Sequence, residues 1–379
     1  MEQKRQEDTT ESNTTHMLQQ CDAEEHKTNK KQTLRVLEFY SGIGGMRYSL
    51  LQSGVAATVV QAFDMNQVAN RVYSHNFGEE PSSKAIEHLT VEELTRYEAD
   101  LYLLSPPCQP YTRAGLQRGN QDNRTNSLLH LLSLLQMLPA SSRPTYLLLE
   151  NVKGFEQSDT CQVLTQVLDY CNYAHQHFLL TPTQFGVPNQ RLRYYCLAKA
   201  MHKGSFYDGA GQLIENLAGL LPPQPGNDYR GHASTCLPLS SFLEKGSDDQ
   251  PSSCFAVPPS FFRSVGYRHD IVSPESMTSS CFTKGYGQNF WAAGPLLLSS
   301  TSCELSVNEI DFADTEFVCS LPLRFFTPRE VANLLGFPSL FSFPADVTIK
   351  QRYRLLGNSL SITVVADLIK YLFQSPGTS

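Results

Sequence analysis

The sequence predicts an α/β fold, a doubly wound, Rossmann-like sheet interrupted by a smaller, loop-rich inserted domain. Between residues 32 and 200, short runs of Leu, Val, Tyr and Phe alternate with helical stretches. Nearly continuous apolar strands of this kind are typical of a parallel sheet covered on both faces. From residue 201 to 322, Pro, Gly and Ser break every periodic pattern, and regular structure returns at 323–379.

The composition is that of a globular protein with an unusual N-terminus. Of the 379 residues, 41% are hydrophobic and 18% are charged, and the net charge is -7. This charge argues against nucleic-acid binding through bulk positive charge, although a local basic groove is compatible with it. Residues 1–31 are rich in charge, Thr and Gln, so we expect a disordered tail, with a charged partner-binding arm as the alternative.

Nothing in the sequence indicates secretion, a membrane or a metal. The N-terminus lacks an apolar signal-peptide stretch, and no apolar run reaches the roughly 18 residues that span a bilayer. The 10 cysteines contain no C-x-x-C pair, which argues against a zinc knuckle. We therefore expect reduced thiols in a protein of the cytoplasm, with the nucleus as a second compartment.

The first elements form a strand–helix–strand unit. Residues 34–40 are a β-branched and aromatic run that ends at glycines, which predicts a buried strand. A helix follows over 44–54, with Gly54 as its C-terminal cap. Residues 58–63 then predict the second strand.

Further elements repeat this alternation. Residues 127–138 form a strongly apolar helix, and four more strands are predicted at 99–104, 145–150, 175–180 and 193–199. In open sheets of this class, ligands bind at the carboxyl ends of the strands.

A well-marked helix follows the predicted insert. Thr327 suits the N-cap, Pro328 the first helical position and Glu330 the third, while Gly336 and Pro338 end the helix. The chain closes with a loop that enters a last helix within residues 355–373.

A glycine-rich turn joins the first strand to the first helix. Gly42, Gly44 and Gly45 let a ligand approach the backbone, and the helix N-terminus offers free N–H groups. The G-x-G-G spacing departs from the dinucleotide fingerprint and favours a nucleoside without a pyrophosphate. Asp64, after the second strand, can accept both ribose hydroxyls. The alternative is a tight turn with a structural role only.

Cys108 lies in "SPPCQPYTRAG", directly after the strand at 99–104. Pro106, Pro107 and Pro110 restrict the backbone and make this loop stiff. The thiol is thereby held at the edge of the sheet where ligands bind. A lone cysteine is otherwise more often a small buried hydrophobic residue.

Glu150 ends the apolar strand at 145–150, where a buried carboxylate is costly unless it is paired or used. Arg191 and Arg193 alternate in "QRLRYY", so we expect both on one face of the strand there. These residues form either a structural ion pair that steadies two strand ends or a reactive acid with an anion-holding partner. Both interpretations can hold together.

These residue types fit one reaction, methylation of cytosine at C5. A thiolate that adds to C6 makes C5 nucleophilic, and a carboxylic acid near N3 offsets the developing charge. An arginine can hold the base oxygen and stabilise the thiolate. S-adenosylmethionine would supply the methyl group, and loss of the C5 proton would release Cys108.

Five motifs resemble those of cytosine-5 methyltransferases of the DNA type and occur in the same order: "FYSGIGG", "SPPCQPYTRAG", "ENVKGFE", "QRLRYY" and "RLLGNSL". The resemblance spans residues 34–370 and implies an S-adenosylmethionine-dependent fold with a target-recognition insert. It implies that Cys108 is the nucleophile, that Glu150 contacts N3, and that Arg191 and Arg193 form the active-site arginine pair. Asn189 departs from the pattern, because many DNA enzymes have Gln there.

The same resemblance implies a set of cofactor-binding residues at the glycine turn and around it. These are Phe39, Ser41, Gly42, Ile43, Gly44, Gly45, Asp64, Met65, Ile86, Glu87, Ser105, Asn358 and Ser359.

A finer match is to the small enzymes that methylate an anticodon-loop cytosine of tRNA for aspartate. It rests on "PPCQPYTRAG", "SSCFTKGYG" at 279–287 and "FFTPREVANLLGFP". It implies tRNA as the partner of a monomeric enzyme, with DNA as a weak ligand. The substrate contacts would be Gln109, Arg113, Asn151, Cys281, Phe282, Thr283 and Lys284.

Three alternatives stay open. Cys281 and Phe282 can instead pack the insert, while Lys284 is merely exposed. The substrate can be DNA, because residue spacing does not separate it from RNA. The chain can also be a non-catalytic nucleoside- or RNA-binding protein that has kept the pocket.

Overall fold

The computed structural model describes residues 33–107, 126–206, 212–216, 236–244, 255–258, 270–288, 293–299 and 314–374, with single residues at 262, 307 and 310. The predicted tail at 1–31 lies outside the described residues. So do Cys108, Gln109 and Arg113.

Within the described residues, seven strands form one sheet in the order β2-β1-β3-β4-β6-β5-β7. Their bounds are β1 Leu34–Phe39, β2 Ala57–Phe63, β3 Leu101–Leu104, β4 Tyr146–Val152, β5 Tyr173–Leu180, β6 Arg193–Ala200 and β7 Leu213–Ile214. The strands predicted from the sequence are confirmed.

The parallel sheet expected from the sequence is confirmed for one part of the sheet only. β2, β1, β3 and β4 pair in parallel, but β6 runs antiparallel to both β4 and β5. The link from β5 to β6 holds only the short 3-10 helix Pro182–Phe185, whereas a parallel return needs a longer crossover, usually through a helix. β6 therefore returns directly between its two neighbours.

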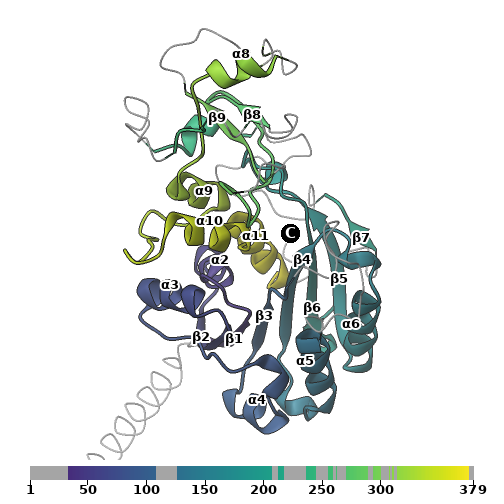
Figure 1. The fold of residues 1–379 in the computed structure, drawn as a ribbon. Helices are drawn as coiled ribbons and strands as arrows, with labels where there is room; N and C mark the ends of the chain where they lie inside the picture. Colours follow the sequence, from purple (N-terminus) through teal and green to yellow (C-terminus); the bar gives the residue numbers. More distant parts are fainter. Residues whose placement is uncertain are drawn as a thin grey trace, which may run out of the picture.

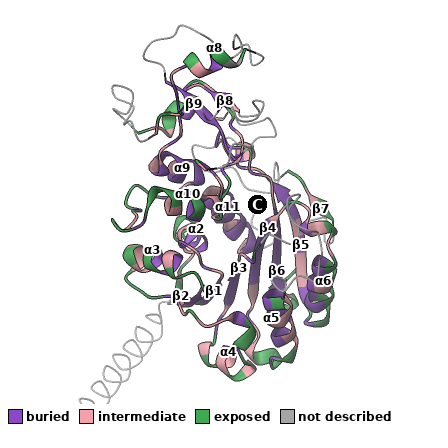
Figure 2. Cartoon of the chain, in the orientation of Figure 1, coloured by how far each residue is buried: buried purple, intermediate pink, exposed green. Residues whose placement is uncertain are grey.

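Helices cover both faces of the sheet (Figure 1). One face packs against a core that includes α2 Gly45–Ser53, α3 Gln67–Phe77 and α11 Ile362–Leu372. The other face packs against α4 Val91–Tyr97, α5 Asn126–Met137 and α6 Asp159–Tyr170. Figure 2 shows the central strands β3, β4 and β6 mostly buried between these two layers.

The segment Ile349–Leu372 is long and apolar enough to cross a membrane, with a mean hydropathy of 1.3 in its best window. It comprises α10 Ile349–Gly357 and α11, separated by residues 358–361. Since 72% of that window is buried inside the protein, it has the burial of a core helix.

A small domain lies beyond the carboxyl ends of the parallel strands (Figure 1). It contains a three-stranded sheet of β8 Ile271–Val272, β9 Leu296–Leu298 and β10 Leu323–Arg324, with α8 Thr315–Ser320. The predicted insert at 201–322 needs two changes at its ends. β7 pairs with β5 in the large sheet, and β10 belongs to the small sheet.

The helix after the small domain is α9 Pro328–Leu335, and its predicted capping residues are confirmed. Thr327 and Glu330 form the capping box, and Gly336 ends the helix at φ 87. Glu330 also makes a buried ion pair with Arg324 of β10, at 2.7 Å. The small sheet is thus tied to α9.

Glu38 of β1 is a buried carboxyl beside the glycine turn. The hydroxyl of Tyr73 donates to its Oε2 at 2.8 Å, and the backbone N–H of Arg47 donates to its Oε1 at 3.3 Å. Burial raises the pKa of Glu38 from 4.5 to about 7, against the opposing effect of the Tyr73 hydrogen bond and the Arg47 charge.

We predict that Glu38→Gln stabilises the protein at alkaline pH. The folded state binds the Glu38 proton more tightly than the unfolded chain does. Stability from this group is therefore lost as pH rises from about 4.5 to about 7. The variant should gain about 3 kcal/mol over wild type at pH 8 and almost nothing at pH 4.5.

Urea unfolding at both pH values measures this difference. Glu79→Gln serves as the matched control, because it removes an exposed carboxylate that also pairs with Arg47. Parallel pH profiles for wild type and Glu38→Gln would contradict the prediction.

Candidate functional site

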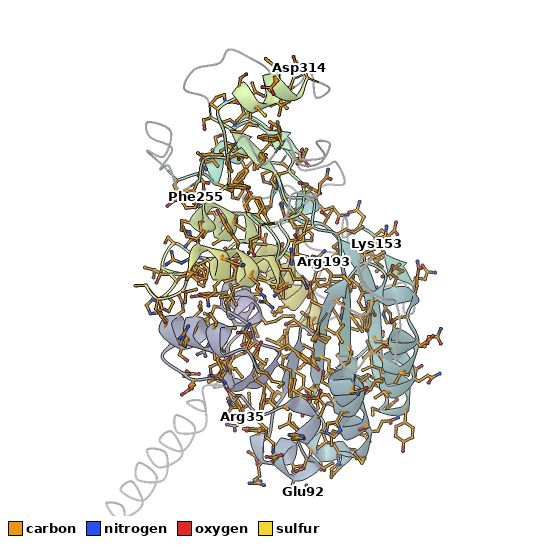
Figure 3. The ribbon with its side chains drawn as sticks, viewed as in Figure 1. Arg35, Glu92, Lys153, Arg193, Phe255 and Asp314 are labelled. Carbon is orange, nitrogen blue, oxygen red and sulfur yellow. The ribbon has the colours of Figure 1, made fainter. Side chains whose placement is uncertain are left out.

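A cavity of about 570 Å³ opens at the carboxyl edge of the parallel strands. Its walls come from the glycine turn, the ends of β2, β3 and β4, the segment before β6, and the end of α10. Figure 3 labels Arg193 where this edge of the sheet faces the small domain. The cavity therefore lies where open α/β sheets bind their ligands.

The glycine turn forms one end of the cavity. Gly42 and Gly44 have φ 53 and 86, in the left-handed region that glycine adopts without strain. A Cβ on Gly45 would lie 3.0 Å from Ser359 Oγ, so a larger residue there would press on the opposite wall. Gly42, Ile43 and Gly45 line the cavity, as predicted cofactor-binding residues should.

Asp64 fixes this turn through its carboxylate. The N–H of Gly42 donates to Oδ2 and the N–H of Asn66 donates to Oδ1, both at 2.8 Å. Burial raises the pKa of Asp64, and these two hydrogen bonds oppose the rise. Each carboxylate oxygen has a further acceptor site, so the side chain can still accept a ribose hydroxyl.

Most of the other predicted cofactor residues also line the cavity. They are Ser41, Met65, Ile86, Glu87, Ser105, Asn358 and Ser359. Phe39 does not line the cavity. Side chains alternate along a strand, and the ring of Phe39 is fully buried in the core between the sheet and α4, α5 and α6. Gly44 is also absent from the lining.

Glu150, the acid of the site, does not end its strand as predicted, because β4 continues for two more residues to Val152. Its Oε1 lies 3.5 Å from Arg193 Nε. Burial raises the pKa of Glu150, and the charges of Arg193 and Arg191 oppose but do not cancel this rise. The carboxyl therefore keeps its proton to a higher pH than an exposed glutamate, as a proton donor requires.

The expectation that Arg191 and Arg193 alternate along one strand is wrong, because β6 begins at Arg193. Arg191 instead lies in the preceding segment, and its backbone N–H bonds to Asn189. Both arginines still line the cavity.

Arg191 has its own set of partners. Its guanidinium donates to the carbonyl oxygens of Phe282 at 3.1 Å and Gly357 at 3.3 Å, and to that of Ser359. These acceptors come from the small domain, from α10 and from the segment after it. Arg191 therefore joins three segments, whereas Arg193 pairs with the acid.

Cys281 places a thiol beside the two arginines. Arg191 Nη1 lies 3.3 Å and Arg193 Nη2 3.9 Å from its sulfur. Burial by itself would raise the pKa of this thiol, but the two guanidinium groups outweigh burial and lower it. The Cys281 sulfur is thus held as an acceptor for the arginine pair.

Most of the predicted substrate contacts that the structure describes do not line the cavity. Among the described ones, only Lys284 lines it. Phe282 is buried and packs on Tyr286 and Phe326, with ring centroids at 5.0 and 5.3 Å. The packing alternative therefore holds for Phe282. Its neighbour Thr283 hydrogen-bonds to the carbonyl oxygen of Ala293 through both its hydroxyl and its backbone N–H.

Asn151 also makes internal contacts instead of lining the cavity. Its Nδ2 donates to the carbonyl of Pro106 at 3.4 Å, and its Oδ1 accepts from the N–H of Val152 at 2.8 Å. Asn189, which departs from the family pattern, is buried and donates to Ser279 and Ser280. Both amides therefore hold loops around the site.

Sequence reasoning missed several residues that line the cavity, among them Tyr40, Asn66, Lys84, Ser127 and Arg354. Tyr40 and Arg354 stand inside motifs quoted for the resemblance, "FYSGIGG" and "RLLGNSL". Their motifs could therefore have identified these two residues. The aromatic residue at the cavity wall was instead predicted one position too early, at Phe39. Lys84 and Asn66 carry no comparable signal.

Comparison with known proteins finds cytosine-5 methyltransferases among the similar chains. The chain is 40% identical over 364 residues to a Dictyostelium discoideum protein named DNA (cytosine-5)-methyltransferase, covering 89% of this chain and 94% of that relative. It is 39% identical over 395 residues to the Homo sapiens tRNA (cytosine(38)-C(5))-methyltransferase, with 90% and 99% covered. The crystal structure of S. pombe Dnmt2 methyltransferase superposes with a TM-score of 0.75 at 34% identity, covering 90% of this chain and 98% of that chain.

The family model for C-5 cytosine-specific DNA methylases matches residues 34–214 and 294–374. These ranges include the glycine turn, Glu150 and both arginines, and leave most of the small domain unmatched. With this match across the cavity and the shared fold, the chain belongs to the C-5 cytosine-specific DNA methylase family.

Proposed function

We propose that this protein transfers a methyl group from S-adenosylmethionine to C5 of a cytosine in the anticodon loop of tRNA, with tRNA for aspartate as substrate. The observation that carries the proposal is Glu150. It is a buried acid with a raised pKa, held 3.5 Å from Arg193 at the wall of a nucleoside-sized cavity. A binding protein has no need of such an acid.

The residues of the cavity fit S-adenosylmethionine. The glycine turn leaves room for a ligand against the first turn of α2, and Asp64 offers acceptor sites for a ribose. The buried Ser41 hydroxyl, which lines the cavity, has no hydrogen-bond partner among the described residues. When bound, S-adenosylmethionine would supply an electrophilic methyl group.

In the proposed mechanism, Cys108 Sγ forms a bond to C6 of the cytosine, which makes C5 nucleophilic. Glu150 gives its proton to N3 as negative charge develops in the ring, and its raised pKa suits this role. Arg193 holds the base oxygen while it stays paired with Glu150. After methylation, the C5 proton leaves to solvent and its electron pair forms the C5–C6 double bond, which expels Cys108 as a thiolate. The proton on N3 returns to Glu150.

A tRNA substrate is supported by the relatives and by physical cost. The matching proteins from Homo sapiens, Bos taurus and Schizosaccharomyces pombe are named tRNA (cytosine(38)-C(5))-methyltransferase. A base in a loop costs less to unstack than one in a duplex. Lys284 and Arg354 are exposed cations in the cavity lining, where they can meet phosphates despite the net charge of -7.

DNA is the second candidate substrate, because the Dictyostelium discoideum relative is named DNA (cytosine-5)-methyltransferase. We predict that labelled methyl groups pass to an unmodified aspartate tRNA transcript at least about tenfold faster than to duplex DNA. Replacing the anticodon-loop cytosine by uridine supplies the matched control. Methylation of DNA alone would overturn the tRNA proposal.

We predict that Cys108→Ala abolishes methyl transfer and covalent trapping by tRNA containing 5-fluorocytosine. Its affinity for S-adenosylhomocysteine should stay within about threefold of wild type, because no bond to the cofactor is lost. Denaturing electrophoresis and calorimetry measure the two effects. Cys319→Ala, in the small domain, is the control thiol. An adduct with Cys108→Ala would assign the nucleophile to another residue.

We predict that Glu150→Gln lowers kcat about 100- to 10,000-fold while the protein stays folded. The wild-type rate should fall on the alkaline side, as pH rises through the raised Glu150 pKa and the acid loses its proton. The residual rate of the variant should lack this alkaline limb. Glu92→Gln, on the exposed start of α4, is the control, and an unchanged alkaline limb in Glu150→Gln would contradict the assignment.

A further inference from the structure

Tyr40 has a backbone conformation that its residue type disfavours. It follows β1 at φ 58, in the left-handed region where a bulky side chain is strained. The other two described non-glycine residues with positive φ, Glu98 and Asn172, lie at the ends of α4 and α6, a usual place for this conformation. Tyr40 lies instead at the wall of the cavity, two residues before Gly42.

The strained residue makes two hydrogen bonds to other parts of the cavity wall. Its hydroxyl donates to Ser127 Oγ in the first turn of α5, at 3.0 Å. Its carbonyl oxygen accepts from Ser105 Oγ, directly after β3, also at 3.0 Å. All three residues line the cavity, and Ser127 is buried.

The two partners, Ser105 and Ser127, flank the segment that contains Cys108. Ser105 lies three residues before Cys108, and Ser127 is the second residue of α5, the helix that follows the Cys108 segment. Tyr40 itself belongs to the glycine turn. One residue of the cofactor-binding turn is therefore bonded to both flanks of the segment that carries the nucleophile.

We infer that Tyr40 is a positioning residue that, through Ser105 and Ser127, sets the distance between the methyl-donor turn and the two described flanks of the Cys108 segment. The inference rests on the proposed function, because it needs a methyl transfer that depends on this distance. Glycine would fit the backbone at residue 40 without strain, as it does at Gly42. The tyrosine instead supplies a hydroxyl that reaches Ser127 of α5, a contact that glycine could not make.

The test compares Tyr40→Phe, Ser127→Ala and the double variant in the full-length protein. Each single change removes one end of the same hydrogen bond. We expect kcat to fall about 10- to 100-fold in each, because small misplacements of reacting groups are costly. The double variant should lose no more than either single one.

Two readouts separate positioning from a loss of fold or of cofactor binding. Affinity for S-adenosylhomocysteine should stay within about threefold of wild type, since the ring of Phe still forms the wall. The melting temperature should change little. The rate of covalent trapping by 5-fluorocytosine tRNA should fall in step with kcat.

The control is Ser133→Ala, which removes a hydroxyl from the same helix that bonds only to the carbonyl of His130 in the described structure. It should keep wild-type rates. Wild-type kcat in Tyr40→Phe, or losses that multiply in the double variant, would overturn the inference. If wild type itself transferred no methyl group, the proposed function would fail instead, which is a separate outcome.

Discussion

The guanidinium of Arg191 is the group around which the site is assembled. A buried cation is costly unless its hydrogen-bond donors are satisfied. Here its two terminal amino groups donate to the carbonyls of Phe282, Gly357 and Ser359 and to the sulfur of Cys281, while Nε has no hydrogen-bond partner among the described residues. The small domain and the end of α10 must both be in place to supply these acceptors. Folding of the two parts is thereby coupled to formation of the cavity.

Close backbone contact strengthens this coupling. A Cβ on Gly357 would collide with the backbone of Thr283 and Lys284, so only glycine lets α10 end against this loop. Asn189 holds the same loop from the other side through Ser280 at 2.9 Å. The position of Lys284 at the cavity follows from these contacts, although its side chain is exposed.

Three carboxyls near the carboxyl edge of the sheet share a raised pKa with one main cause, burial. They are Glu38, Asp64 and Glu150. Their partners differ: Glu38 has a tyrosine and a backbone N–H, Asp64 has two backbone N–H groups, and Glu150 has an arginine. Asp64 fixes the glycine turn and Glu38 the start of α2, whereas Glu150 lines the cavity beside Arg193.

Apolar runs and glycine spacing determined the strands, the helix over 45–53 and the capped helix at 328–335, because these depend on local sequence. The cysteine loop, Glu150 and most of the cofactor wall were likewise visible as residue types after predicted strands. Local patterns do not encode which strand returns antiparallel, so the direction of β6 was not predicted. For the same reason, Arg191 was predicted on a strand that begins only at Arg193. Phe39 was predicted at the cavity wall, where the structure has Tyr40.

What the tertiary structure alone decided are the contacts between residues distant in sequence. Arg191 and Phe282 are 91 residues apart, and Tyr40 and Ser127 are 87 apart. No periodicity reports such pairs, because each depends on how separate elements pack. The sequence therefore determined which chemical groups this protein has, whereas packing decided which of them face the cavity and which hold it in shape.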